Sequence, residues 1–149
     1  MAGVFSQIYI HIVFSVKNRE ALILPEWEEN LYKYTTGIIE KRGHKMLAIG
    51  GMPDHIHIFF GLKPAEAISD LVREIKKATN EYVKDQRLST NKFDWQTGYG
   101  AFSYRITNKR ATSGEVGLLT PFPTRIQNVL NFPACSGFYQ LERVGSAVR

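Results

Sequence analysis

The chain has 149 residues, the length of one domain, and is long enough to bury a core without disulfides. Its composition, 44% hydrophobic and 12% aromatic, excludes a disordered protein, and its single cysteine excludes an intrachain disulfide framework and an all-cysteine zinc site. The formal charge of +5 favours a polyanionic partner. No leader pattern opens the chain and no apolar run approaches ~18 residues, so we expect a cytoplasmic protein without a membrane segment.

The first third of the chain predicts a strand followed by a helix. Apolar residues alternate over residues 4–16 and place four large side chains on one face, which is typical of a half-buried strand. A polar turn covers residues 17–20. Pro25 is well placed to begin a helix, because an acidic first turn follows it, and Gly43 marks the helix end.

Residues 46–61 predict a hairpin, with strands on either side of a turn at Pro53 and Asp54. A second amphipathic helix follows Pro64 and runs to about Gln86, where helical spacing of apolar residues ends. Residues 87–92 are a polar loop, and residues 93–104 lead into a fourth strand.

The order strand, helix, strand, strand, helix, strand predicts an α+β, ferredoxin-like fold. We expect an antiparallel sheet of four to five strands with both helices on one face, which leaves the other face open. Residues 1–104 form the predicted core domain. Residues 105–149 differ in composition, being rich in Gly, Pro, Ser and Thr, and form a divergent tail.

His55 and His57 are the candidate metal ligands. In a strand, alternate residues point to the same face, so these two imidazoles lie side by side and can hold one divalent cation. The alternative is a pair of hydrogen-bonded strand histidines. His11 is either a plain strand residue or a neighbour of the pair, and Asp54 either orients an imidazole or caps its own turn.

Three stretches together resemble a known family. They read Ile-His-Ile-Val-Phe at 10–14, Met-Pro-Asp-His-Ile-His-Ile at 52–58 and Trp-Gln-Thr-Gly-Tyr-Gly-Ala-Phe-Ser at 95–103. In this order they resemble the single-tyrosine HUH transposases of bacterial insertion sequences, the IS200-like type. The resemblance implies a homodimeric enzyme that cuts and rejoins single-stranded DNA with hairpin ends. It also implies Mg²⁺ or Mn²⁺ held by His55 and His57, and a tyrosine hydroxyl that forms a covalent phosphotyrosine link.

The chain departs from this family after residue 104. The resemblance implies a helix carrying Tyr-x-x-x-Gln, with its tyrosine near Leu118, and no such pattern follows in this sequence. Tyr139 in the tail is therefore the candidate nucleophile, and the alternative is a loop or packing aromatic. We expect strand transfer to be impaired or absent. A frameshifted or replaced C-terminus is a hypothesis, which the other two reading frames of the encoding DNA would test.

Basic side chains are candidate phosphate contacts, with a solvated charged face as the alternative; they are Lys17, Arg73, Lys76 and Arg105. A different function, a non-catalytic module that binds single-stranded nucleic acid, would use Tyr9 and Tyr99 to stack bases. A phosphodiesterase that uses water as nucleophile would need more carboxylates near the histidines than Asp54 supplies.

Overall fold

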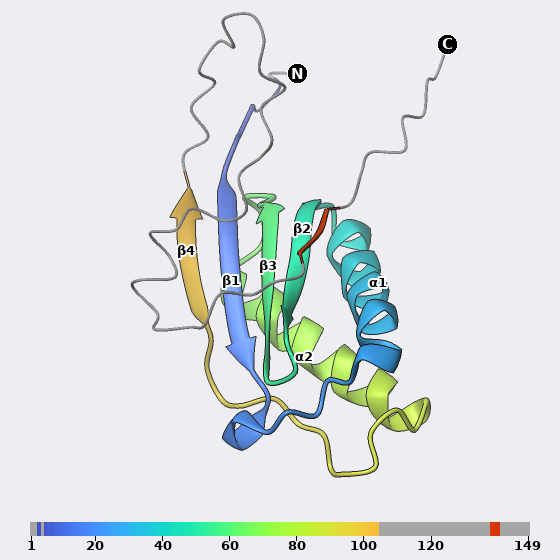
Figure 1. The fold of residues 1–149 in the computed structure, drawn as a ribbon. Coiled ribbons are helices and arrows are strands. Elements are labelled where there is room, and N and C mark those ends of the chain that lie inside the picture. The colour runs from blue at the N-terminus through green and yellow to red at the C-terminus, as the bar shows by residue number, and fades with distance from the viewer. Residues whose placement is uncertain (1–2, 4, 105–137, 141–149) are drawn as a thin grey trace, which may run out of the picture.

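The computed structural model describes residues 3, 5–104 and 138–140, and the statements below concern these residues. Its elements follow the predicted order, with a short 3₁₀ turn after the first strand and one more strand from the tail (Figure 1). They are β1 Tyr9–Ser15, η1 Lys17–Arg19, α1 Pro25–Lys41, β2 Lys45–Met52, β3 His55–Gly61, α2 Ile68–Asp85, β4 Gly100–Tyr104 and β5 Phe138–Gln140.

The five strands form one antiparallel sheet in the order β4-β1-β3-β2-β5. The first four strands have the ferredoxin-like order, so the predicted fold class is confirmed. β1 lies between β3 and β4, and its register with β3 places Val13 opposite His57 and Ser15 opposite His55. A register shift between Met46 and Ala48 marks a bulge in β2.

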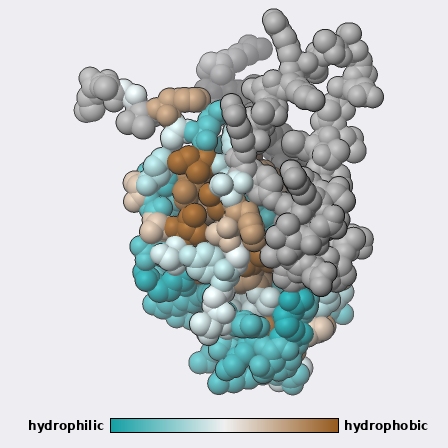
Figure 2. Space-filling model, turned by 90° about the vertical axis from the view of Figure 1, so that its left-hand side faces the viewer, coloured by the Kyte–Doolittle hydropathy of each residue, from teal (hydrophilic) through white to brown (hydrophobic). Residues whose placement is uncertain are grey.

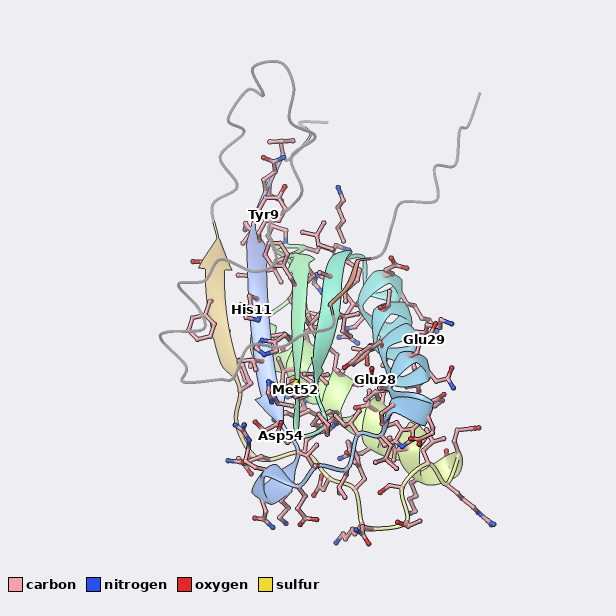
Figure 3. The ribbon with its side chains drawn as sticks, in the orientation of Figure 1. Tyr9, His11, Glu28, Glu29, Met52 and Asp54 are labelled. Carbon is pink, nitrogen blue, oxygen red and sulfur yellow. The ribbon has the colours of Figure 1, made fainter. Side chains whose placement is uncertain are left out.

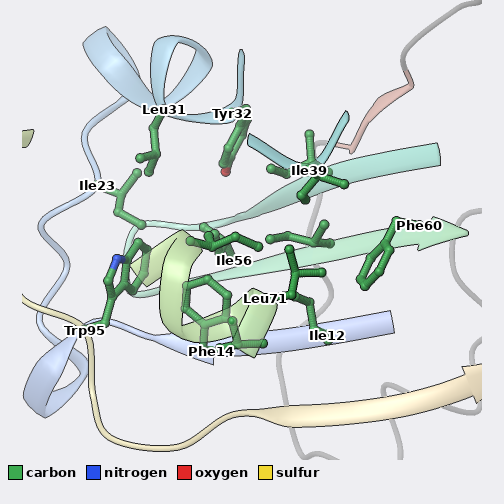
Figure 4. Close-up of a cluster of buried hydrophobic side chains, with 14 of the residues drawn as sticks. Ile12, Phe14, Ile23, Leu31, Tyr32, Ile39, Ile56, Phe60, Leu71 and Trp95 are labelled. Atoms are coloured by element: carbon green, nitrogen blue, oxygen red, sulfur yellow. The ribbon is translucent and has the colours of Figure 1, made fainter. Parts of the chain in front are cut away.

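Both helices pack on one face of the sheet, and the core lies between them and the strands (Figure 4). Alternate residues of β1 and β3 supply the sheet side of the core, and apolar residues of α1 and α2 supply the other side. These side chains include Ile12, Phe14, Ile56, Phe60, Leu31, Ile39 and Leu71, each 3% exposed or less. Alternation therefore turns the remaining residues of the same strands, including the histidines, away from the helices.

The helix boundaries agree with the sequence signals. Pro25 is the first residue of α1, and Gly43 follows its end with φ of 87°, a left-handed conformation that favours glycine. The first strand is shorter than the predicted 4–16, because its pairing with β3 and β4 begins at Tyr9. Within the described residues, no helix is long and apolar enough to span a bilayer.

The segment before β4 is held to both β1 and α2. Gln96 N donates to Ser15 O at 2.8 Å, and the indole Nε1 of Trp95 donates to Thr79 Oγ1 at 2.8 Å. Trp95 also packs edge-on against Phe14, with ring centres 4.7 Å apart. The fourth strand starts at Gly100, inside the stretch 93–104 that was expected to lead into it, and residues 94–96 before it pack and bond across the end of β1.

Candidate metal centre

The site lies on the sheet face opposite the helices, at the end of the sheet where the β2–β3 turn lies (Figures 1 and 3). His55 and His57 are the first and third residues of β3, and they alternate with the core residues Ile56 and Ile58. Their ring centres are 5.0 Å apart and the ring planes make an angle of 76°. The strand period thus brings the two predicted ligands side by side.

Each imidazole has a polar partner at its Nδ1 atom. His55 Nδ1 lies 2.7 Å from Asp54 Oδ1, and His57 Nδ1 lies 2.9 Å from His11 Nε2. A carboxylate only accepts hydrogen bonds, so His55 carries its proton on Nδ1 and uses Nε2 toward any metal. Carboxylate–histidine pairs of this kind orient metal ligands in many proteins. Asp54 therefore orients an imidazole, the first of the two roles considered for it.

His11 joins the pair through the sheet register. It lies opposite Phe59, two residues from the position opposite His57, so His11 and His57 are diagonal neighbours across β1 and β3. Their rings stack with centres 5.1 Å apart and an interplanar angle of 19°. The neighbour role of His11 is the one that the structure supports.

Burial keeps these histidines neutral. It lowers the pKa of His11 to about 4, and burial together with the neighbouring His11 and His55 lowers the pKa of His57 to about 3. Burial also lowers the pKa of His55, although the hydrogen bond with Asp54 opposes this shift. Neutral imidazole is the form that binds metals, so the pair has the protonation state of a ligand at pH 7.

The spacing of the pair fits one shared cation. A metal bound at ~2.1 Å from a ring nitrogen lies roughly 3.2 Å from that ring's centre. Two such rings at coordination angles of about 90–110° have centres roughly 4.5–5.2 Å apart, and the observed 5.0 Å lies in this range. The spacing of the rings is therefore compatible with two nitrogen ligands to one divalent cation.

Two features of the histidine pair differ from an exposed site with a full set of protein ligands. We expected the pair on an open sheet face, but His55 is fully buried and His57 is 7% exposed. In addition, the described residues contain no group of three or more His, Cys, Asp or Glu side chains placed to hold an ion. Within this part of the chain the candidate ligands are therefore two, and a cation such as Mg²⁺ commonly completes its shell with water and phosphate oxygens.

Arg19 is a charged partner of Asp54 that the sequence analysis did not identify. Arg19 donates from Nε to Asp54 Oδ2 at 2.8 Å, and its Nη2 atom lies 2.7 Å from the same oxygen. Burial raises the pKa of Asp54, but hydrogen bonds from His55 and Arg19 outweigh burial and lower it below its ordinary value. Asp54 is therefore ionised at neutral pH.

The family model "Transposase IS200 like" matches residues 4–113, which is most of the chain and includes every residue of this site. The chain belongs to the family of IS200-like transposases. The suspected resemblance is thus confirmed at the level of the family.

Individual relatives agree with this assignment. The ISDra2 transposase TnpA of Deinococcus radiodurans is 29% identical over 77 residues, which are 52% of this chain and 55% of that protein. This IS200-like chain therefore matches about half the length of that curated relative.

Two solved structures share the fold. A candidate transposase from Deinococcus radiodurans R1 has a TM-score of 0.59 at 20% identity, over 72% of this chain and 85% of that one. A REP-associated tyrosine transposase bound to a REP hairpin has a TM-score of 0.53 at 18% identity, over 72% and 62%. At these identities the two structures support the fold of this IS200-like transposase.

Two of the candidate phosphate contacts of this IS200-like transposase lie on α2. Arg73 and Lys76 line a hollow of about 330 Å³ between α2 and residues 94–99. Lys76 Nζ donates to the carbonyl oxygen of Gln96 at 2.8 Å and to that of Gly98, and burial lowers its pKa. Lys76 thus anchors a loop, whereas Lys17 is exposed at the end of β1.

The two remaining candidate residues of this IS200-like transposase, Tyr139 and Arg105, belong to the tail. Tyr139 lies in β5, where the backbone register pairs it with Ile49 of β2. Two strand steps, roughly 10 Å, separate β5 from the histidine strand β3. Arg105 and the region of the missing Tyr-x-x-x-Gln helix lie outside the described residues.

Proposed function

We propose that this protein is a single-strand DNA-binding member of the IS200-like transposases that holds Mg²⁺ or Mn²⁺ between His55 and His57. The observation that carries the proposal is the pairing of these two neutral imidazoles, each with Nδ1 engaged by Asp54 or His11. The REP-associated tyrosine transposase with the same fold was solved bound to a REP hairpin, which supports single-stranded DNA with hairpin ends as the proposed partner of this chain.

The roles of the residues follow from their positions. A divalent cation at this site would polarise a DNA phosphate and stabilise charge that develops on it. His55 and His57 would hold the cation, while Asp54 and His11 fix the orientation of the two rings. Ring rotation would otherwise compete with binding, so the two partners increase affinity by preorganising the ligands.

The proposal includes a defect in strand transfer. Transfer in this family needs a tyrosine oxygen to replace an ester oxygen at phosphorus, which releases a hydroxyl group and conserves the bond energy in a phosphotyrosine. Tyr139 is the candidate for this role, but the glutamine partner expected one helical turn later is missing from the sequence. We therefore expect DNA binding and cation binding to be retained and covalent chemistry to be weak or absent.

A non-catalytic nucleic-acid module is the second candidate function. It is favoured by the two-ligand site within the described residues and by Tyr99, which is 42% exposed and lines the hollow beside Arg73 and Lys76. Base stacking on such an exposed ring tolerates any sequence. This module would bind single strands with strong salt dependence and without any requirement for a cation.

A denaturing gel separates these functions. The full chain is incubated with hairpin-tipped single-stranded DNA and Mn²⁺, and a covalent adduct appears as a band that survives denaturation. The proposal expects little or no adduct, together with native binding that Mn²⁺ strengthens and His57→Gln weakens. Binding that neither Mn²⁺ nor this substitution changes would favour the non-catalytic module.

A strong adduct would show that the chain is a competent transposase. Tyr139→Phe then tests the nucleophile, with Tyr82→Phe as a matched control, because Tyr82 stacks against Tyr34 at the α1–α2 surface. The proposed homodimer is tested by sedimentation with and without DNA. If His57→Gln and Tyr139→Phe are each inactive but active when mixed, each chain completes its partner's site.

A further inference from the structure

Arg19, Asp54 and His55 form a continuous chain of hydrogen bonds that ends at the metal site. One carboxylate oxygen of Asp54 binds the guanidinium of Arg19, at 2.8 Å from Nε and 2.7 Å from Nη2. The other oxygen lies 2.7 Å from His55 Nδ1. Asp54 is thus held on both sides, and both contacts are charge-assisted hydrogen bonds, which are shorter and stronger than neutral ones.

The backbone at Arg19 adopts a conformation that non-glycine residues rarely use. Asn18 and Arg19 have φ of 58° and 57°, in the left-handed region, within the short turn η1. Such outliers persist where surrounding structure maintains them, and they cluster at functional sites. Here the left-handed turn directs the Arg19 side chain back to Asp54, 35 positions later in the sequence.

The β2–β3 turn is held in place by other contacts. Val16 N donates to the carbonyl oxygen of Asp54 at 2.8 Å, and Ile23 N donates to that of Pro53 at 2.9 Å. These backbone bonds fix the turn against residues 16–23 whatever side chain occupies position 19. Loss of the Arg19 side chain therefore releases the carboxylate of Asp54 while the turn stays in place.

We propose that Arg19 is a positioning residue of the metal centre. By holding one carboxylate oxygen of Asp54, it directs the other oxygen to His55 Nδ1, so that His55 Nε2 faces the cation. This inference rests on the proposed metal-binding function. Without Arg19 the carboxylate has other rotamers available, so the His55 ring loses a fixed partner and its tautomers mix.

A purely structural ion pair would behave differently. The side chains of Arg19 and Asp54 are 42% and 23% exposed, and pairs in such partly exposed positions contribute little to folding stability. Removal of an outer partner of a metal ligand, by contrast, weakens metal binding by about 10–100-fold. Arg19→Ala should therefore lower cation affinity with almost no change in the thermal unfolding midpoint.

Arg87→Ala is the matched control. Arg87 is also an exposed arginine with a positive φ, 52°, and it follows α2 rather than the β2–β3 turn. The control therefore also removes one positive charge and replaces one arginine whose backbone is in the left-handed region, but it removes no contact to Asp54. Any effect that both variants share reflects charge or backbone alone.

The experiment measures the metal and the imidazole separately in the full chain. Mn²⁺ binding is titrated by electron paramagnetic resonance, and the tautomer of His55 is read from its imidazole ¹⁵N shifts in metal-free protein. We expect Arg19→Ala to weaken Mn²⁺ binding about tenfold and to change the His55 shifts from the Nδ1–H tautomer toward a mixture. Arg87→Ala should stay within about twofold of wild type, and Arg19→Lys should recover part of the affinity.

A double variant tests the coupling. Asp54→Asn should weaken binding at least as much as Arg19→Ala, and adding Arg19→Ala to Asp54→Asn should change little, because both act through one carboxylate. If the effects of the two substitutions multiply, or if Arg19→Ala leaves the His55 shifts unchanged, the inference is wrong.

Failure of the proposed function has a different signature. If wild-type protein does not bind Mn²⁺, cation binding at this site is refuted, and the ¹⁵N shifts still decide whether Arg19 orients His55. A retained Nδ1–H tautomer in Arg19→Ala overturns the positioning role in that case as well. If Arg19→Ala fails to fold, Arg19→Lys and Asp54→Asn supply the same two measurements.

Discussion

The buried imidazole pair predicts that this protein loses stability in mild acid. His11 and His57 have pKa values of about 4 and 3 in the folded protein and an ordinary value of 6.5 when exposed. When folding lowers the pKa of a base, the unfolded chain takes up the proton at a higher pH than the folded protein does. The free energy of unfolding is therefore greatest above pH 6.5 and decreases as the pH falls. Between pH 6.5 and pH 5, protonation of each ring in the unfolded chain lowers the free energy of unfolding by about 1.36 kcal/mol per pH unit, or about 2 kcal/mol in total.

Together the two rings should lower the free energy of unfolding by about 4 kcal/mol between pH 7 and pH 5, which is a large part of a typical domain's stability. His55 shifts in the same direction, whereas Asp54 and Glu66, whose pKa values are lowered, act mainly below this window. Urea unfolding followed by circular dichroism at pH 7, 6 and 5 measures the loss. EDTA is included so that metal binding adds no pH dependence of its own.

Glutamine variants isolate the contribution of the two rings. Glutamine keeps a polar side chain but does not titrate, so the double variant His11→Gln with His57→Gln should lose most of the pH dependence, and His11→Gln alone about half. The comparison uses the change with pH within each variant, so a lower starting stability does not affect it. A wild-type loss below ~1 kcal/mol, or an equal loss in the double variant, would refute the reasoning.

Two further predictions concern the hairpin and the DNA. In Gly51→Ala the new Cβ would lie 2.2 Å from a backbone carbonyl oxygen of β3, so we expect about 3 kcal/mol or more of destabilisation in urea unfolding. Gly37→Ala in α1, with nothing within 4 Å, should instead stabilise by about 0.5–1 kcal/mol; similar effects of the two substitutions would contradict the steric argument. In single-strand binding titrations, Lys17→Ala and Arg73→Ala should each reduce the salt slope by about 0.7 if each contacts one phosphate. Lys33→Ala, which removes a lysine paired with a carboxylate on α1, should leave the slope unchanged.

The fold was predictable because local signals and the global pattern agree. Period-two alternation in β1 and β3 identified the core face, and Pro25 and Gly43 marked the limits of α1. The start of the fourth strand was less predictable. Trp95 is of a residue type common in strands, but it packs across the end of β1 and its indole donates a hydrogen bond to Thr79, which only the tertiary structure reveals.

The histidine pair was predictable from the sequence, whereas its supports were only partly so: the sequence offered the roles of His11 and Asp54 as alternatives, and it gave no sign of Arg19. His55 and His57 are two residues apart, so strand alternation alone brings them together. The partnership of His11 with His57 depends on a sheet register across 46 positions, and that of Arg19 with Asp54 on a left-handed turn. Burial of the pair also escaped prediction, because strand alternation specifies which face a residue occupies and not how much of that face is covered.

The place of β1 in the sheet has a consequence for how the protein is made. The strand lies inside the sheet, but both of its neighbours, β3 and β4, leave the ribosome long after it. Until residues 55–61 are synthesised, the nascent chain contains an apolar strand whose two edges are both unpaired. Strands of this kind tend to self-associate. Because its contacts are distant in sequence, closure of this sheet is slow compared with helix formation. Early protection of the Ile-His-Ile-Val-Phe segment, by a chaperone or by the ribosome surface, would therefore influence the yield of folded protein.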